Sequence, residues 1–254
     1  MIIDTHCHLY LNEFKKDIEQ VIERAEAEGV RKFCLPGIDS SEIDNMLLLE
    51  ERFPGKCIAM MGLHPCSVKE NYQDELDIVK NWLTKRKFAA VGEIGLDFYW
   101  DETFAEQQYI AFRTQIELSL KYNLPIVIHT RDAMQETIDV VKEYEPKGVK
   151  GIFHCFSGSI ENAKEITDAG FYLGIGGVVT YKNAGLAEVL DKVDLKHIVL
   201  ETDSPYLTPV PFRGKRNESS YLKFVVERLA AIKNVSAEEV AEVTSTNAEK
   251  IFGL

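Results

Sequence analysis

Short apolar segments alternate with amphipathic helical segments along the whole chain. Eight apolar segments fit buried strands, at residues 2–8, 32–37, 57–65, 89–95, 125–130, 151–156, 171–175 and 198–203. Apolar residues at helical spacing follow each of them, at residues 18–25, 41–52, 74–85, 102–122, 134–141, 161–169, 186–192 and 222–229. A last helix begins after Ser236, which is expected to form a capping box with Glu239. Strands that alternate with helices form parallel sheets, and eight such units predict an α/β fold, a closed (β/α)8 TIM barrel.

No linker-like or low-complexity stretch interrupts the alternation, so we expect a single domain over residues 1–254. A doubly wound open sheet is the structural alternative. Such a sheet normally carries a Gly-x-Gly-x-x-Gly turn after its first strand, and Gly174, Gly176 and Gly177 do not fit that pattern.

The net charge of -12 at pH 7 argues against broad binding of polyanions. A role on nucleic acid would therefore need a local basic patch or bound cations. No apolar run approaches the ~18 residues of a membrane span, and no signal-peptide pattern opens the chain. The five cysteines include no Cys-x-x-Cys pair and read as reduced thiols. We expect a cytoplasmic protein with no membrane contact and no obligate protein partner.

Two histidines lie close together in the first expected strand. Successive side chains of an extended strand point to opposite faces, so Asp4, His6 and His8 share one face. Neutral imidazole is a common ligand of divalent first-row metals, and two imidazoles about 6 to 7 Å apart can bind one ion from the same side. This pair predicts a metal site, and a polar strand end with two unrelated histidines is the simpler alternative.

Other histidines and carboxylates fall late in the expected strands, namely His64, Glu93, His129, His154 and Asp203. In a barrel, the C-terminal ends of the strands form one rim, which is where barrel active sites are built. A cluster of imidazoles and carboxylates on that rim indicates metal binding at a catalytic site.

Several longer motifs are spread over the chain: Ile3-Asp4-Thr5-His6-Cys7-His8-Leu9, Gly62-Leu63-His64-Pro65, Gly92-Glu93-Ile94-Gly95-Leu96-Asp97, Pro125-Ile126-Val127-Ile128-His129-Thr130-Arg131, His154-Cys155-Phe156-Ser157-Gly158, Glu201-Thr202-Asp203-Ser204-Pro205-Tyr206-Leu207 and Arg213-Gly214-Lys215-Arg216-Asn217-Glu218. Together they resemble, from end to end, the TatD family of metal-dependent hydrolases and deoxyribonucleases within the amidohydrolase superfamily. Ser219 stands where relatives often place a proline.

The resemblance implies a site for two divalent metal ions. The implied ligands are His6, His8 and Asp203 for one ion, His129 and His154 for the other, and Glu93 as the bridge between them. Because the bridge is Glu, no carboxylated lysine is needed. Mg, Mn or Zn suits this mixed set of imidazoles and carboxylates. Two such ions can activate a water for hydrolysis, and we expect Asp203 to accept its proton as the catalytic residue.

Neighbouring residues have other expected roles. His64 is not an implied ligand and is expected to contact a phosphate, with a structural role as the alternative. Glu201 and Asp97 are expected to position the ligands without taking part directly in catalysis.

Further substrate contacts are expected from Arg131 and from the loop after the last strand, which contains Arg213, Lys215, Arg216 and Asn217. Guanidinium and ammonium groups gathered at an active rim can hold phosphates, and a solvated loop is the alternative. Tyr99, Trp100 and Tyr206 can stack on bases or serve only the structure.

Three functions compete at this stage. The leading one is a two-metal phosphodiesterase that acts on DNA as an exonuclease, trimming single-stranded ends. The second is hydrolysis of a carboxylic ester or amide, such as an aminoacyl-tRNA, since the same metals can polarise a carbonyl group. The third is a metal-dependent binding protein without catalysis. A complete ligand set together with Asp203 argues against this third function.

Overall fold

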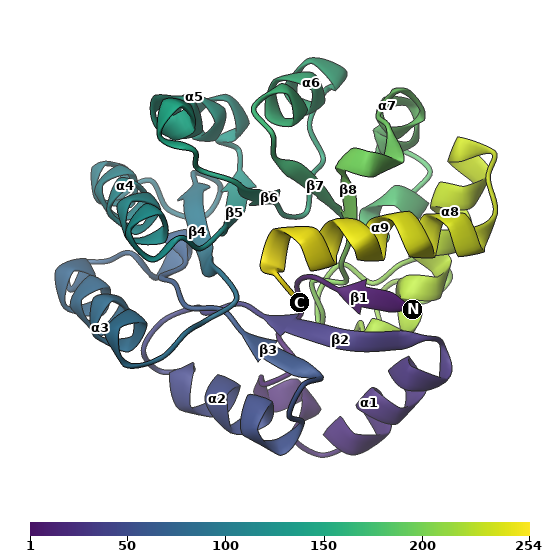
Figure 1. Ribbon diagram of the computed structural model, residues 1–254, viewed down its shortest axis with the longest axis horizontal. Helices are drawn as coiled ribbons and strands as arrows, with labels where there is room; N and C mark the ends of the chain where they lie inside the picture. Colours follow the sequence, from purple (N-terminus) through teal and green to yellow (C-terminus); the bar gives the residue numbers. More distant parts are fainter.

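The computed structural model describes residues 1–254, in which eight parallel strands alternate with helices around a ring (Figure 1). The strands are β1 (Ile2–Asp4), β2 (Val30–Leu35), β3 (Cys57–Ala59), β4 (Val91–Asp97), β5 (Ile126–Arg131), β6 (Gly151–Phe153), β7 (Tyr172–Ile175) and β8 (Ile198–Leu200). The helices are α1 (Ile18–Ala27), α2 (Ile43–Arg52), α3 (Tyr72–Lys85), α4 (Ala105–Tyr122), α5 (Met134–Tyr144), α6 (Ile160–Asp168), α7 (Leu186–Lys192), α8 (Leu222–Lys233) and α9 (Ala237–Phe252). None of them combines the length and the apolar character needed to cross a bilayer.

The strands form two parallel sheets, β1-β2-β3 and β4-β5-β6-β7-β8, which meet at two seams. At one seam, Met61 bridges to Val91 beyond the end of β3. At the other, Cys7 bridges to Ser204, and the Thr5 amide donates to the Leu200 carbonyl at 2.9 Å. Backbone hydrogen bonds therefore link the first strand to the last, as the expected (β/α)8 barrel requires.

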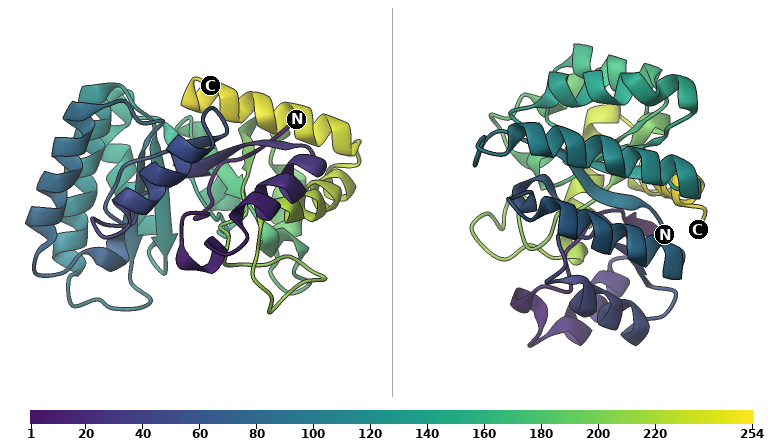
Figure 2. Two further views of the ribbon diagram at one scale, coloured as in Figure 1. Left: turned by 90° about the horizontal axis from the view of Figure 1, so that it is seen from below. Right: turned by 90° about the vertical axis from the view of Figure 1, so that its left-hand side faces the viewer.

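The interior of the ring is a small apolar cluster that helix α9 covers at one end. Strand residues such as Ile3, Val127 and Val199 point inward and pack against Ile251 and Phe252 of α9. Figure 2 shows α9 lying across the ring on the side where the chain begins. Because this end is closed by packed side chains, a site in the ring can open only at the opposite end, where the strands terminate.

Five of the eight strands end earlier than the sequence predicts, whereas β4 and β5 end one or two residues later. The first was expected to extend through residue 8 and the last through residue 203, but β1 ends at Asp4 and β8 ends at Leu200. Asp203 has a φ of 55°, a left-handed conformation that a strand cannot contain. After β1, β6 and β8 the chain therefore leaves the sheet before His6, His154 and Asp203, which places these side chains over the end of the barrel.

Helix α9 begins at its expected cap. The Ser236 hydroxyl accepts a hydrogen bond from the Glu239 amide at 3.1 Å. The expected return bond from Glu239 is not formed, so this is a serine cap and not a full capping box.

Candidate metal centre

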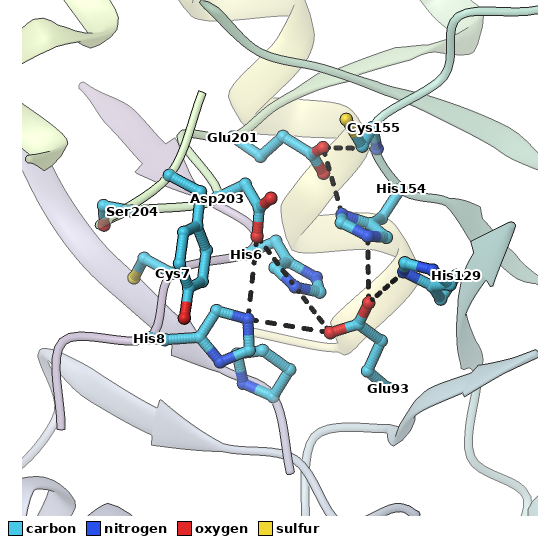
Figure 3. A network of polar contacts seen from close by, with 12 residues as sticks. His6, Cys7, His8, Glu93, His129, His154, Cys155, Glu201, Asp203 and Ser204 are labelled. Atoms are coloured by element: carbon cyan, nitrogen blue, oxygen red, sulfur yellow. Dashed lines mark hydrogen bonds and ion pairs between the residues drawn. The ribbon is translucent and has the colours of Figure 1, made fainter. Parts of the chain in front are cut away.

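Six histidine and carboxylate side chains meet over the C-terminal end of the barrel (Figure 3): His6, His8, Glu93, His129, His154 and Asp203. Glu93 and His129 belong to strands β4 and β5, and the others follow strands β1, β6 and β8. The structure thus brings together every residue that the sequence proposed as a ligand, from segments that are far apart along the chain.

The Glu93 carboxylate lies at the middle of this cluster and is only 2% exposed. Its Oε2 atom faces His6 Nε2 at 3.1 Å and His8 Nε2 at 3.6 Å. Its Oε1 atom faces His154 Nε2 at 3.0 Å and His129 Nδ1 at 2.8 Å. Each carboxylate oxygen therefore faces two of the expected ligand imidazoles, an arrangement suited to a residue that bridges two cations.

Asp203 completes the half of the cluster formed by His6 and His8. Its Oδ1 atom lies 3.7 Å from His6 Nε2 and 3.6 Å from His8 Nε2. Its amide donates to the His6 carbonyl at 2.9 Å, which ties the loop after β8 to the segment after β1. The Asp203 side chain is 16% exposed, so this carboxylate stands where the cluster opens to solvent.

Tyr10 fixes the orientation of His8. The Tyr10 hydroxyl donates to the Pro36 carbonyl at 2.5 Å and lies 2.9 Å from His8 Nδ1. Since a hydroxyl has a single hydrogen, it must accept from His8 Nδ1–H. The lone pair of His8 is then on Nε2, which points into the cluster as a metal ligand must.

Two carboxylates hold the other histidines from outside the cluster. Asp97 Oδ2 lies 2.8 Å from His129 Nε2 and can accept its proton when Nδ1 binds a cation. Glu201 Oε1 lies 3.3 Å from His154 Nδ1 and accepts from the Cys155 amide at 2.5 Å. These positions agree with the supporting roles expected for Asp97 and Glu201.

Gly174 leaves the space that the Glu201 carboxylate occupies. A Cβ atom at position 174 would overlap Glu201 Oε2 and would lie 3.0 Å from the His154 Cα atom. Any larger residue in this part of β7 would displace the carboxylate from His154.

His64 also faces Glu93, but its ring has the opposite orientation. Its Nδ1 atom accepts from the Cys66 amide at 3.0 Å, and its Nε2 atom lies 3.2 Å from Glu93 Oε1. A neutral ring that accepts at Nδ1 carries its proton on Nε2. His64 therefore presents a donor to the cluster, unlike His8, and its geometry alone would have grouped it with Glu93 and His129 as a possible ligand.

The cluster has features that a bound cation would satisfy. Both ring nitrogens of His6 are buried without a hydrogen bond, although buried polar groups are normally paired. The His6 and His154 rings stack with centroids 3.8 Å apart and planes 10° from parallel, a poor arrangement for two imidazolium ions. Converging imidazoles and carboxylates with unpaired nitrogens fit Zn, Mn or Mg, and the residues present therefore fit the implied metals.

Burial and mutual attraction both perturb the pKa values here. Burial raises the pKa of Glu93, but the imidazoles of His64, His154 and His6 hold it well below its usual range. Burial lowers the pKa of His6, which favours the neutral form of its ring. Burial also opposes the charge on His154, yet Glu93 and Glu201 raise its pKa well above the usual value. A cation that binds this ring nitrogen would have to displace that proton.

Asp4 does not join the cluster, although strand alternation places it on the face of His6. It is buried beneath the site, where it accepts from the Thr202 amide at 3.0 Å and from the Ser219 hydroxyl at 2.6 Å. Burial raises the pKa of Asp4 to about 7. The bonds to Thr202 hold the loop that carries Asp203.

Arg216 and Asn217 do not face the cluster, in contrast to the expectation for the loop after β8. Arg216 forms two hydrogen bonds to Asp17, at 2.8 and 2.7 Å. Asn217 is fully buried and donates to the carbonyls of Thr202 and Tyr206 at 2.8 and 2.7 Å. The structure thus gives both residues structural roles in place of the expected contacts with substrate.

The other expected substrate contacts remain exposed at the rim. Arg131, Arg213 and Lys215 form no ion pair, and each has its cationic group near an aromatic ring. Arg213 lies 4.1 Å from the centroid of the Tyr181 ring. No carboxylate of the protein neutralises their positively charged groups.

Sequence reasoning missed the role of Tyr10, although a signal for it was present. Tyr10 stands two residues after His8, as His8 stands two residues after His6. The two-residue spacing that places both histidines on one face therefore places the Tyr10 hydroxyl on that face as well. Its contact with Pro36, 26 residues away, could not be found from local spacing.

Comparisons with known proteins agree with this geometry. A family model described as TatD related DNase matches residues 3–253. An uncharacterized metal-dependent hydrolase of Bacillus subtilis (strain 168), YabD, is 41% identical over 253 residues, which cover 99% of each chain. A protein of Erwinia tasmaniensis named 3′-5′ ssDNA/RNA exonuclease TatD is 30% identical over 259 residues, which cover 100% of each chain. The crystal structure of YJJV, a TatD homolog of Escherichia coli K12, matches with a TM-score of 0.94 and 30% identity, over 100% of this chain and 98% of that one.

Proposed function

This chain belongs to the TatD family of DNase-related, metal-dependent hydrolases, and from that premise we propose that it is an exonuclease that hydrolyses phosphodiester bonds at single-stranded DNA ends. The relative named as a 3′-5′ ssDNA/RNA exonuclease supports this choice of substrate. The observation that carries the proposal is the Glu93 carboxylate, each of whose oxygens faces a separate pair of the expected ligand imidazoles.

We assign the ligands of two divalent ions, with Glu93 as the shared residue. His6, His8 and Asp203 form one half of the site, and His129 and His154 form the other. When bound, two such ions lower the pKa of water and stabilise negative charge on a phosphoryl group. Tyr10, Asp97 and Glu201 keep the lone pairs of three of these histidines directed inward.

Two partly exposed side chains of the cluster, those of Asp203 and His64, act on the substrate. The pKa of Asp203 lies below its usual value, because the imidazoles beside it, His8 first, outweigh the upward effect of burial. It is therefore ionised and can accept the proton of the attacking water. The side chain of His64 is 15% exposed, and its Nε2–H can donate to a phosphoryl oxygen.

Cleavage of an end-labelled single strand tests the proposal. Metal-stripped protein resupplied with Mg, Mn or Zn should shorten the strand from one end. Asp203→Asn should bring turnover close to the background rate while leaving the thermal unfolding midpoint within a few degrees. Lys164→Gln on the outer surface of α6 is the matched control, since the Lys164 side chain is 70% exposed. Intact DNA at confirmed metal loading, with hydrolysis of an aminoacyl-tRNA by the same protein, would instead favour the carboxylic ester substrate.

A further inference from the structure

All three exposed aromatic side chains of the molecule lie on loops at the open end of the barrel. Tyr99 and Trp100, on the loop after β4, are 51% and 68% exposed. Tyr206, on the loop after β8, is 52% exposed. The other aromatic residues are buried or half-buried. Exposing rings of this size to water is unfavourable, and their gathering around the site indicates an interaction surface.

These aromatic residues lie at the two ends of a row of imidazole rings. In that row, His8 lies 5.1 Å from His6, His6 lies 3.8 Å from His154, and His154 lies 5.7 Å from His129, measured between ring centroids (Figure 3). Tyr206 adjoins the first ring, with its centroid 6.3 Å from that of His8.

The loop of Tyr99 and Trp100 is attached to the other end of the row. Asp97 faces His129 through Oδ2, and through Oδ1 it accepts from the amides of Tyr99 and Trp100 at 3.0 and 3.3 Å. One carboxylate therefore holds both a candidate ligand and the backbone of the aromatic pair. The backbone that carries these rings is therefore tied to the cluster.

Arg131 adds a cation to this second end. Its guanidinium carbon lies 3.6 Å from the centroid of the Tyr99 ring and 5.1 Å from that of Trp100. Its guanidinium forms no hydrogen bond and no ion pair with the protein, so its N–H donors are free. An aromatic ring beside an unpaired guanidinium matches a nucleotide, whose base stacks and whose phosphate accepts hydrogen bonds.

We propose that Trp100, supported by Tyr99 and Arg131, and Tyr206 form two base-stacking surfaces on opposite sides of the metal centre, so that the substrate is an unpaired strand with a base on each side of the scissile phosphate. This inference rests on the proposed function and deepens it. Bases in a duplex stack on one another, so only an unpaired strand can place its bases on these rings. A simple phosphoester has no base that could stack on either surface.

Tryptophan fluorescence tests the binding step without catalysis. The chain contains two tryptophans, Trp82 on α3 and Trp100. A phosphorothioate oligothymidylate, which resists hydrolysis, should quench the fluorescence of the metal-loaded protein in a saturable way. Trp100→Phe should remove the quenching while retaining binding, because the phenylalanine ring can still stack on a base. Quenching that is absent, or equal with an abasic oligomer, would overturn the proposal.

Cleavage of abasic strands tests the two surfaces separately. Removing the base on either side of the scissile phosphate should lower kcat/KM of the wild-type protein about 5- to 150-fold. Trp100→Ala should lose its sensitivity to one abasic position and Tyr206→Ala to the other. Leu48→Ala, on α2 and 64% exposed, is the control and should retain both. Unchanged sensitivity in both aromatic variants would refute the assignment.

The two proposals fail separately. If the protein cleaves DNA but DNA does not change the Trp100 fluorescence, the exonuclease proposal stands and the stacking surfaces are refuted. If the quenching is saturable but no strand is cleaved, the stacking surfaces stand and the exonuclease proposal is refuted.

Discussion

Replacing Tyr10 by Phe removes a single hydroxyl and tests whether a residue outside the ligand set controls the metal centre. That hydroxyl accepts from His8 Nδ1–H and donates to the Pro36 carbonyl. Without it, His8 loses the contact that directs its lone pair toward Glu93 and Asp203. The ring can then rotate or adopt the other tautomer.

The size of the effect follows from burial. Tyr10 is 4% exposed and His8 also 4%, so water does not replace the lost hydroxyl. A buried polar group left without a partner costs about 1 to 3 kcal/mol. We therefore expect the free energy of unfolding to fall by this amount, and the affinity for metal to fall about 10- to 100-fold, as for other residues that support a metal ligand.

Titration calorimetry with Mn or Zn measures the affinity, and urea unfolding measures the stability. Tyr122→Phe is the matched control, because the Tyr122 hydroxyl forms no hydrogen bond and lies at the end of α4. It should bind metal like the wild-type protein. An unchanged metal affinity in Tyr10→Phe, with the fold intact, would refute the assignment of the His8 tautomer.

Two further predictions concern the support of the site and of the loop after β8. Gly174→Ala should displace the Glu201 carboxylate from His154 and lower metal affinity about tenfold or more; the same titration checks this, and wild-type affinity would contradict it. The pKa of Glu218, which burial raises, is nonetheless held below its usual value by Arg24. A lowered carboxyl pKa stabilises the fold at pH values above about 4.3 and ceases to do so as pH falls through the folded-state value. Because the Arg24 side chain is 46% exposed and solvent screens the pair, Arg24→Met should cost about 0.5 to 1 kcal/mol at pH 7 and less at pH 3. Urea unfolding at both pH values measures this, and an equal cost at the two would count against it.

The order of strands and helices could be predicted because periodicity is a local property of the sequence. The family and the α/β barrel class are confirmed. The ends of the strands could not be placed, because they depend on contacts across the ring. Asp203, for example, leaves the strand conformation while its amide bonds to the carbonyl of His6.

The convergence of the candidate ligands followed from their positions late in the strands. Which basic residues stay free could not be predicted, because an ion pair depends on a partner elsewhere in the chain. Arg216 is occupied by Asp17, which is 199 residues away, whereas Arg213 is exposed. These two arginines cannot be distinguished by composition or spacing. Only the tertiary structure shows which of them forms an ion pair.

The seam between β1 and β8 also sets when this site can arise during synthesis. Thr5 and Leu200, which are joined there, are 195 residues apart. A growing chain therefore exposes His6 and His8 long before the ribosome adds Asp203, and contacts between such distant segments form late in folding. The cluster closes only once β8 has been made and has paired with β1. An unfinished chain carries the histidines but lacks the assembled centre, so hydrolysis would begin only in molecules whose barrel is complete.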